Sequence, residues 1–233
     1  MTTRSRRYQR SRTQVEKGRE YGLQEAIEIL KSMSQARFDE TVECAVSLGI
    51  EPRHSDQQVR GTITLPHGTG KEVTVAVFAE GSAAEEAREA GADYVGSDDL
   101  IEKVEEGFMD FDVALAEPQM MGRIGKLGRF LGPRGLMPSP KSGTMRQDVG
   151  QAVEEFKAGK IEFRNDAGGN LHAPVGKLSF STQELVENVQ AFVGELLRLK
   201  PLSAKGRYLR KVYLSSTMSP AVRVDIAEAF SRS

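Results

Sequence analysis

The chain of 233 residues contains little cysteine and histidine and no long run of apolar residues. Its only cysteine, Cys44, cannot form a disulfide within the chain. The histidines, His54, His67 and His172, lie far apart, so a zinc site has almost no ligands to be built from. The apolar runs are too short for a membrane helix of about 20 residues, and no charged start followed by an apolar stretch indicates a secretory signal. We expect a protein of the reducing cytoplasm with no metal and no membrane partner.

The net charge is close to zero, but the charges are distributed unevenly along the chain. The formal net charge is −1, yet residues 1–66 and 160–233 together carry plus six and residues 67–159 carry minus seven. This asymmetry indicates that one part of the molecule contacts a polyanion. The alternative is an uneven surface charge that is merely solvated. Residues 118–159 are basic on balance, so one end of the acidic middle can also meet phosphate.

The two ends of the chain have the patterns of a mixed α+β domain. Residues 1–20 are arginine-rich and indicate a basic arm; a transit peptide is the alternative, but helical patterning begins directly at residue 21. Apolar spacing predicts a helix over 23–33, and alternation predicts a half-buried strand over 38–50 with Cys44 in the core. After residue 160 we predict a hairpin bent at 167–170, a helix that Ser181 or Thr182 can cap and that stops at the proline at 201, and strands over 208–214 and 222–224.

The middle of the chain alternates strands with helices. The apolar run at 73–79 is typical of a strand buried on both faces. Further strands are predicted at 94–95 and 112–116, with helices over 82–90, 98–106, 118–130 and 147–158. This alternation favours a parallel sheet with crossover helices. We therefore predict an α+β split domain, residues 1–66 and 160–233, with an inserted Rossmann-like α/β domain, residues 67–159, joined by a turn-rich hinge at 66–71.

Motifs for nucleotide chemistry and catalysis are incomplete. The sequence G-T-G-K at 68–71 has Leu65 where a P-loop has its first glycine and Glu72 where it has a hydroxyl residue. The first strand of the middle is followed by a single glycine beside Glu80, which does not fit a dinucleotide fingerprint. No nucleophile elbow is present. We predict no catalytic residue, no cofactor and no enzymatic activity.

A stiff loop over residues 132–144 is a candidate binding segment. Three prolines and three glycines in G-P-R-G-L-M-P-S-P-K-S-G-T predict a long, mostly non-helical loop. A plain connector is the alternative, although loops of this length are uncommon unless they are functional. Its candidate contacts are Arg134, Met137 and Lys141.

The split domain carries a mixture of basic, amide, hydroxyl and apolar side chains without a catalytic pair. Such a mixture suits RNA, whose phosphates are neutralised and whose sugars and bases are packed or hydrogen-bonded. Each of these residues taken alone is more typical of a structural role than of RNA binding. The candidates near the predicted hairpin are Arg164, Asn165, Asp166, His172 and Lys177, and those at the ends of two other strands are Arg37, Phe38, Thr217 and Met218.

Several separated motifs resemble the L-one family of bacterial large-subunit ribosomal proteins. The resemblance covers residues 8–224 and rests on S-D-Q-Q-V-R-G-T at 55–62, L-P-H-G-T-G-K at 65–71, G-R-F-L-G-P-R-G-L-M-P-S-P-K at 128–141, F-R-N-D at 163–166, H-A-P-V-G-K at 172–177 and S-T-M at 216–218. It implies a protein that binds large-subunit ribosomal RNA at the mobile side stalk, beside the exit site for transfer RNA. It further implies that the split domain makes the main RNA contact, that the 132–144 loop makes a second one, and that the protein represses its own operon messenger RNA.

The resemblance also assigns positions within the contact. Phe38 and Thr41 match the family's contact strand, and Arg37 stands where lysine is common. Ser216, Thr217 and Met218 match its contact loop. Ser219 departs from the family, which usually has glycine there; if that glycine served a positive φ or a close approach to RNA, serine would strain or displace the loop.

The sequence therefore predicts a cytoplasmic, ribosome-associated, non-enzymatic RNA-binding protein that acts as a monomer within the ribosome. Its expected partners are large-subunit ribosomal RNA, exit-site transfer RNA and its own messenger RNA. Two alternatives stay open: an enzyme that binds a small molecule at the inserted parallel sheet, and an RNA regulator that acts away from the ribosome.

Overall fold

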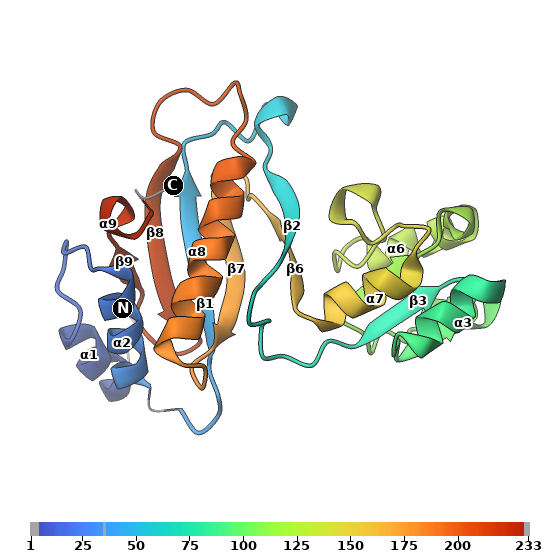
Figure 1. Ribbon diagram of the computed structural model, residues 1–233, viewed down its shortest axis with the longest axis horizontal. Coiled ribbons are helices and arrows are strands. Elements are labelled where there is room, and N and C mark those ends of the chain that lie inside the picture. The colour runs from blue at the N-terminus through green and yellow to red at the C-terminus, as the bar shows by residue number, and fades with distance from the viewer. Residues whose placement is uncertain (1–4, 35, 231–233) are drawn as a thin grey trace. The chain divides into compact units, whose positions relative to one another are not determined.

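The computed structural model describes residues 5–34 and 36–230, except the side chain of Lys141. The chain divides into two compact units, a first unit of Met1–Gly70 with Ile161–Ser233 and a second unit of Lys71–Lys160. The polypeptide therefore passes twice between the units (Figure 1). Among these residues, no helix combines the length and apolar character that crossing a bilayer requires.

The first unit is built on a four-stranded antiparallel sheet in the order β7-β1-β8-β9. Its strands are β1 (Thr41–Leu48), β7 (Asn170–Lys177), β8 (Leu209–Ser216) and β9 (Val222–Val224). Two helices, α2 (Leu23–Met33) and α8 (Thr182–Arg198), pack on one face (Figure 1). The alternating residues Val42, Cys44 and Val46 face these helices in the core, as the sequence predicts. The opposite face of the sheet carries mainly polar and small side chains, together with Tyr213 of β8.

Helix α8 begins at a complete capping box. The Ser181 hydroxyl accepts the backbone N–H of Glu184, and the Glu184 carboxylate accepts the backbone N–H of Ser181. These bonds satisfy donors that the first helical turn leaves free. Two shorter helices complete the first unit: α1 (Arg6–Thr13), which occupies part of the predicted basic arm, and α9 (Ile226–Phe230).

The hairpin expected after residue 160 is not formed. β6 (Lys160–Arg164) pairs with β2 (Arg60–Thr64) in a separate two-stranded sheet, whereas β7 pairs with β1. A short 3-10 turn, Ser55–Gln57, precedes β2. The reason lies in Asn165, whose carboxamide oxygen accepts the backbone N–H of Val59 at 2.7 Å and so fastens the end of β6 to the chain that leads into β2.

The second unit has the predicted parallel sheet with crossover helices, in the order β4-β3-β5. The strands are β3 (Val75–Phe78), β4 (Tyr94–Gly96) and β5 (Val113–Ala116), and the longer helices are α3 (Gly81–Glu89), α4 (Asp98–Glu105) and α7 (Val149–Lys157). All four side chains of β3 are buried and alternate between two apolar clusters, one with α3 and α7 and one with α4. β3 is therefore the central strand with a covered surface on each side, as its apolar run predicts.

The single helix expected over 118–130 is a series of short turns. They are Pro118–Met120, α5 (Met121–Ile124), Gly125–Leu127 and α6 (Gly128–Leu131). Glycines at 122, 125 and 128 lower the preference for one continuous helix. The buried residues Ile124, Leu127 and Leu131 still share one apolar cluster, so the segment packs correctly despite the interruptions.

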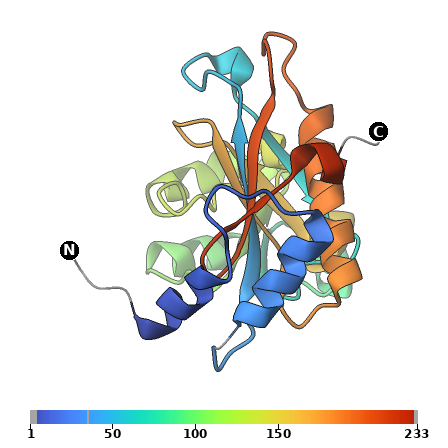
Figure 2. The same ribbon diagram turned by 90° about the vertical axis from the view of Figure 1, so that its left-hand side faces the viewer.

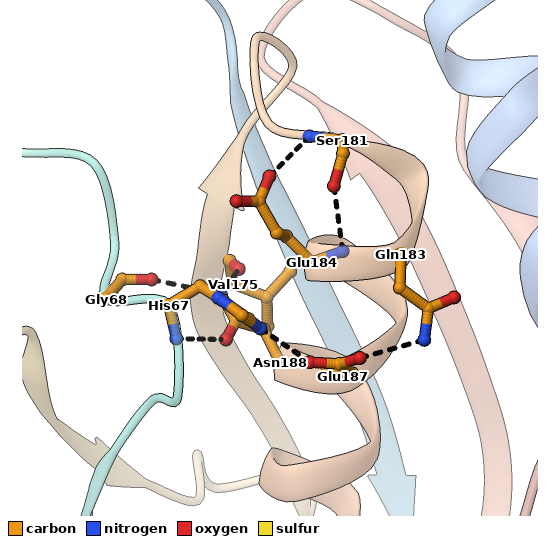
Figure 3. A network of polar contacts seen from close by, with 8 residues as sticks. All are labelled: His67, Gly68, Val175, Ser181, Gln183, Glu184, Glu187 and Asn188. Atoms are coloured by element: carbon orange, nitrogen blue, oxygen red, sulfur yellow. Dashed lines mark hydrogen bonds and ion pairs between the residues drawn. The ribbon is translucent and has the colours of Figure 1, made fainter.

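The chain that leaves β2 is fastened to α8 by a buried amide (Figure 3). Asn188 is fully buried; its side chain accepts the backbone N–H of His67 and donates to the carbonyl oxygens of Gly68 and Val175. The His67 ring lies 2.6 Å from the Glu187 carboxylate on the exposed side. Residues 67–68 are thus part of the first unit's packed structure.

Candidate nucleic-acid interface

Strand pairing gathers several predicted contact residues at one end of the first unit's sheet. Thr41, the first residue of β1, lies opposite Lys177, the last residue of β7. The next residue of β1 lies opposite Ser216, the last residue of β8. The sheet order β7-β1-β8 therefore brings the loop before β1 next to the turn after β8, although about 175 residues separate them in the sequence.

A buried carboxylate holds the turn after β8 in place. Glu40 is only 2% exposed. Its Oε2 accepts hydrogen bonds from Ser216 Oγ at 2.7 Å and from the backbone N–H of Met218 at 2.8 Å, and its Oε1 accepts one from Ser34 Oγ at 3.2 Å. Hydrogen bonds to an ionised acceptor are stronger than those between neutral groups. Glu40 therefore fixes the position of Met218 relative to β1.

Sequence reasoning missed Glu40, although a signal was present. The alternation that places Val42 and Cys44 in the core assigns the same inward direction to position 40. An acidic residue in that position is a buried polar group that requires partners. The sequence does not identify those partners, because they come from residues 34, 216 and 218.

Threonines join the two segments at the surface. The Thr41 backbone N–H donates to Thr217 Oγ1 at 3.2 Å, and the Thr217 N–H donates to the Thr41 carbonyl oxygen at 3.2 Å. On the other side, Lys177 Nζ donates to Thr41 Oγ1 at 2.8 Å. Thr41 thus positions both a cation and the turn that carries Met218.

Two large apolar side chains are exposed beside these polar groups. Phe38 is 55% exposed and Met218 is 46% exposed, and an exposed Arg37 precedes the phenylalanine. The sequence places Phe38 in a half-buried strand; the structure starts β1 at Thr41, so Phe38 lies in the preceding loop and faces solvent. We use the name contact patch for the six residues Arg37, Phe38, Thr41, Lys177, Thr217 and Met218.

Ser216 and Ser219 shape the patch from within. Ser216 is buried, and its backbone N–H donates to Ser219 Oγ at 2.9 Å. The Ser219 hydroxyl in turn donates to the Pro220 carbonyl oxygen at 3.0 Å. No non-glycine residue of the described chain, Ser219 included, has a positive φ. The expected backbone strain is therefore absent, and the serine hydroxyl closes the turn with hydrogen bonds that glycine cannot make.

The candidates from the F-R-N-D and H-A-P-V-G-K motifs, apart from Lys177, do not join the contact patch. Asp166 lies where β6 leads into β7, and β7 runs about 20 Å from there to Lys177. His172 lies opposite Ala45 in mid-sheet and is exposed. Arg164 is exposed at the end of β6. Strand direction, which the motifs do not reveal, separates this group from the patch.

Two members of that separate group have structural roles. Asn165 is buried and bridges Val59 and the carbonyl oxygen of Asp166. Asp166 accepts the backbone N–H groups of Asn170 at 2.7 Å and Gly168 at 2.8 Å. These bonds favour the ionised carboxylate, so the pKa of Asp166 lies below its ordinary value. Both side chains are committed to the turn between β6 and β7.

The loop over residues 132–144 belongs to the second unit and is internally ordered. Ser142 and Thr144 are buried, their hydroxyls lie 2.8 Å apart, and Thr144 Oγ1 accepts the Ser139 N–H. Met137 packs against the apolar cluster of α4, whereas Arg134 is exposed. For Lys141 the structure describes the backbone but not the side chain. The loop therefore presents Arg134 outward and uses Met137 at least partly for packing.

The chemistry of the contact patch is that of binding. It offers two cations, two hydroxyl groups and two apolar side chains, which can meet phosphates, sugars and base surfaces. Throughout residues 5–34 and 36–230, no group of three or more histidine, cysteine or acidic side chains is arranged to hold a metal ion.

Comparison with known proteins identifies close relatives. Residues 30–220 match the model of the ribosomal protein L1p/L10e family. The chain is 56% identical over 222 residues to the large ribosomal subunit protein uL1 of Thermobifida fusca, covering 95% of this chain and 94% of the relative. It is 54% identical over 225 residues to the large ribosomal subunit protein uL1 of Kosmotoga olearia, covering 97% of each.

Proposed function

Because the chain belongs to the ribosomal protein L1p/L10e family, we propose that its contact patch binds large-subunit ribosomal RNA at the mobile side stalk, beside the exit site for transfer RNA. The family is one of structural ribosomal proteins, so binding rather than catalysis is the activity to explain. Exit-site transfer RNA is the second partner in this proposal. The protein acts as a single copy in each ribosome.

One observation carries the proposal: a buried carboxylate fixes an exposed methionine next to cations and hydroxyl groups. Exposed apolar side chains are normally unconstrained, but Glu40 fastens the backbone of Met218 to the start of β1. A fixed patch loses little conformational freedom on binding, which favours affinity. Arg37 and Lys177 supply charge for phosphates, and Phe38 and Met218 supply surface for sugars and bases.

We further propose that the same patch represses translation of the protein's own messenger RNA. A folded messenger segment that presents phosphates and sugars as the stalk RNA does competes for the same side chains. The 132–144 loop of the second unit is the candidate for an additional contact, through Arg134 and Lys141, with Met137 supporting the loop.

A salt series tests RNA binding by the full chain. Neutralising phosphates releases counterions, so log affinity for a stalk ribosomal RNA fragment falls linearly with log salt, with a slope of roughly −0.7 to −0.9 for each phosphate contacted. A slope near zero would contradict the proposal. Co-sedimentation with large subunits at moderate salt separates a ribosomal protein from a regulator that acts away from the ribosome.

A further inference from the structure

We propose that α1 and the strands β8 and β9 form a second binding pocket, which takes a nucleoside phosphate. The pocket has a volume of about 350 Å³ and lies entirely in the first unit. It is distinct from the contact patch, although Pro220 in its lining follows directly after the turn that carries Met218. The ligand is either one nucleotide of an RNA strand that continues from the patch, which rests on the proposed function, or a free nucleotide, which does not.

The walls of the pocket come from distant parts of the chain. One wall consists of α1 and the segment that follows it, and the other consists of the solvent-facing side of β8 and β9. Figure 2 shows the segment between α1 and α2 crossing beside these two strands. Its charged and aromatic lining includes Tyr8, Arg12, Lys17, Arg19, Tyr213 and Arg223.

The segment after α1 is held in a defined conformation. Tyr21 exchanges backbone hydrogen bonds with β9, donating to the Arg223 carbonyl oxygen at 3.0 Å and accepting the Asp225 N–H at 2.8 Å. Its phenolic oxygen accepts the Glu16 N–H at 2.8 Å. The Arg19 guanidinium lies 4.6 Å from the centre of the Tyr21 ring. The pocket wall is therefore built before any ligand arrives.

The lining contains four cations and one carboxylate, and the cations divide into two kinds. Arg19 pairs with Glu16 and Glu25, and Arg223 pairs with Glu20, so these two are neutralised and hold the wall. Arg12 and Lys17 form no ion pair with any residue that the structure describes, and both are exposed. The uncompensated charge of the pocket therefore lies on Arg12 and Lys17, which is the arrangement that a phosphate requires.

Aromatic surface accompanies this charge. Tyr213 stands on the uncovered face of the sheet, opposite Arg223 of β9, and is partly exposed. Tyr8 of α1 lines the other side. Bases of any identity stack on aromatic side chains, and the backbone phosphate follows a basic groove. Two cations with two tyrosines therefore indicate a nucleoside phosphate rather than a simple anion.

The test measures binding of a short 5′-phosphorylated oligoadenylate, adenosine monophosphate and inorganic phosphate to the full chain. Arg12→Gln with Lys17→Gln is expected to weaken oligoadenylate binding roughly tenfold and to reduce its salt slope by roughly 0.7 per lost contact. Tyr213→Leu is expected to weaken it by a similar factor, whereas Tyr213→Phe, which keeps the ring, retains it. The matched control, Arg10→Gln with Lys205→Gln, removes the same charge outside the pocket and leaves affinity within about twofold of wild type.

The outcomes separate the ligands and the two proposals. Binding of oligoadenylate but not of the monophosphate assigns the pocket to an RNA chain, and equal binding of both assigns it to a free nucleotide. If inorganic phosphate binds as tightly as the nucleotides, the claim that the pocket recognises a nucleoside is wrong. If the pocket variants and the control variant have equal effects on affinity, the claim that the ligand binds in this pocket is wrong. Met218→Asp distinguishes the sites, because Met218 does not line the pocket: this variant weakens the stalk RNA complex more than it weakens oligoadenylate binding.

Discussion

The backbone N–H of Met218 donates a hydrogen bond to Glu40 Oε2 at 2.8 Å, across 178 positions of sequence. The same oxygen accepts Ser216 Oγ. A buried carboxylate thereby sets the geometry of an exposed turn, and it does so without facing solvent itself. Glu40 is a positioning residue for the contact patch.

Glu40→Ala leaves the Ser216 hydroxyl and the Met218 N–H without their partner. We expect a loss of about 1–3 kcal/mol in the free energy of unfolding and weaker binding of stalk RNA. Glu40→Gln, which keeps an acceptor of the same shape, retains most of both. Urea unfolding and RNA titration of the two variants check this. Equal RNA affinity for the alanine variant and wild type would remove the positioning role.

Ser219→Gly restores the residue that is usual in the family but removes two hydrogen bonds from the turn. Since the serine has no positive φ, glycine relieves no strain and adds flexibility to the unfolded chain. We expect the glycine variant to be less stable than wild type by about 1 kcal/mol, with Ser219→Ala between them. A glycine variant as stable as wild type would show that the serine hydroxyl contributes nothing.

Asn188→Leu tests the fastening of residues 67–68 to α8. Leucine cannot pair with the His67 N–H or with the carbonyl oxygens of Gly68 and Val175, so buried polar groups lose their partner. We expect the free energy of unfolding to fall by more than about 2 kcal/mol. Glu187→Gln on the exposed side of α8 is the comparison, and its effect in the same urea experiment should be much smaller.

Asp166 gives the first unit a dependence on acid pH. Its folded-state pKa is lowered, chiefly by the hydrogen bond from the Asn170 N–H, so its stabilising effect is present above the ordinary pKa of 3.8 and is lost as the pH falls through the folded value. The carboxyl carbon of Asp166 should therefore titrate below 3.8 in an NMR experiment. The stability difference between wild type and Asp166→Asn should shrink as the pH falls through that range. A midpoint at or above 3.8 would contradict this.

Local sequence patterns were sufficient to predict the helices and strands whose form depends on residues close together in the sequence. The apolar run before the first glycine of the second unit specifies β3 as a doubly buried strand, and helical spacing specifies α2 and α8. Where a strand pairs with a partner far away in the sequence, local patterns did not predict the pairing. Nothing in the F-R-N-D motif shows that Asn165 reaches Val59 rather than turning β6 onto β7.

The sequence predicted which residue types form the candidate site better than it predicted how those residues are arranged in space. Thr41, Lys177 and Met218 come together because strand order places three strand ends side by side, and that order depends on long-range pairing. Phe38 continues the alternating pattern of β1, but it precedes Thr41, the first residue of that strand. The pattern therefore predicted a half-buried side chain, whereas Phe38 is exposed. Glu40 was overlooked because an isolated acid in a core-facing position reveals no partner.

RNA binding by the contact patch is tested most directly by two substitutions that place the same negative charge on an exposed apolar residue. Met218 lies in the contact patch, whereas Leu202 is fully exposed in the loop after α8. We measure the affinity of a stalk ribosomal RNA fragment for Met218→Asp, Leu202→Asp and wild type, with thermal unfolding as the check on folding. We expect Met218→Asp to weaken binding by more than about 1 kcal/mol, through lost packing and repulsion of phosphate, and Leu202→Asp to bind within about twofold of wild type. Equal affinities for the two folded variants would contradict this expectation.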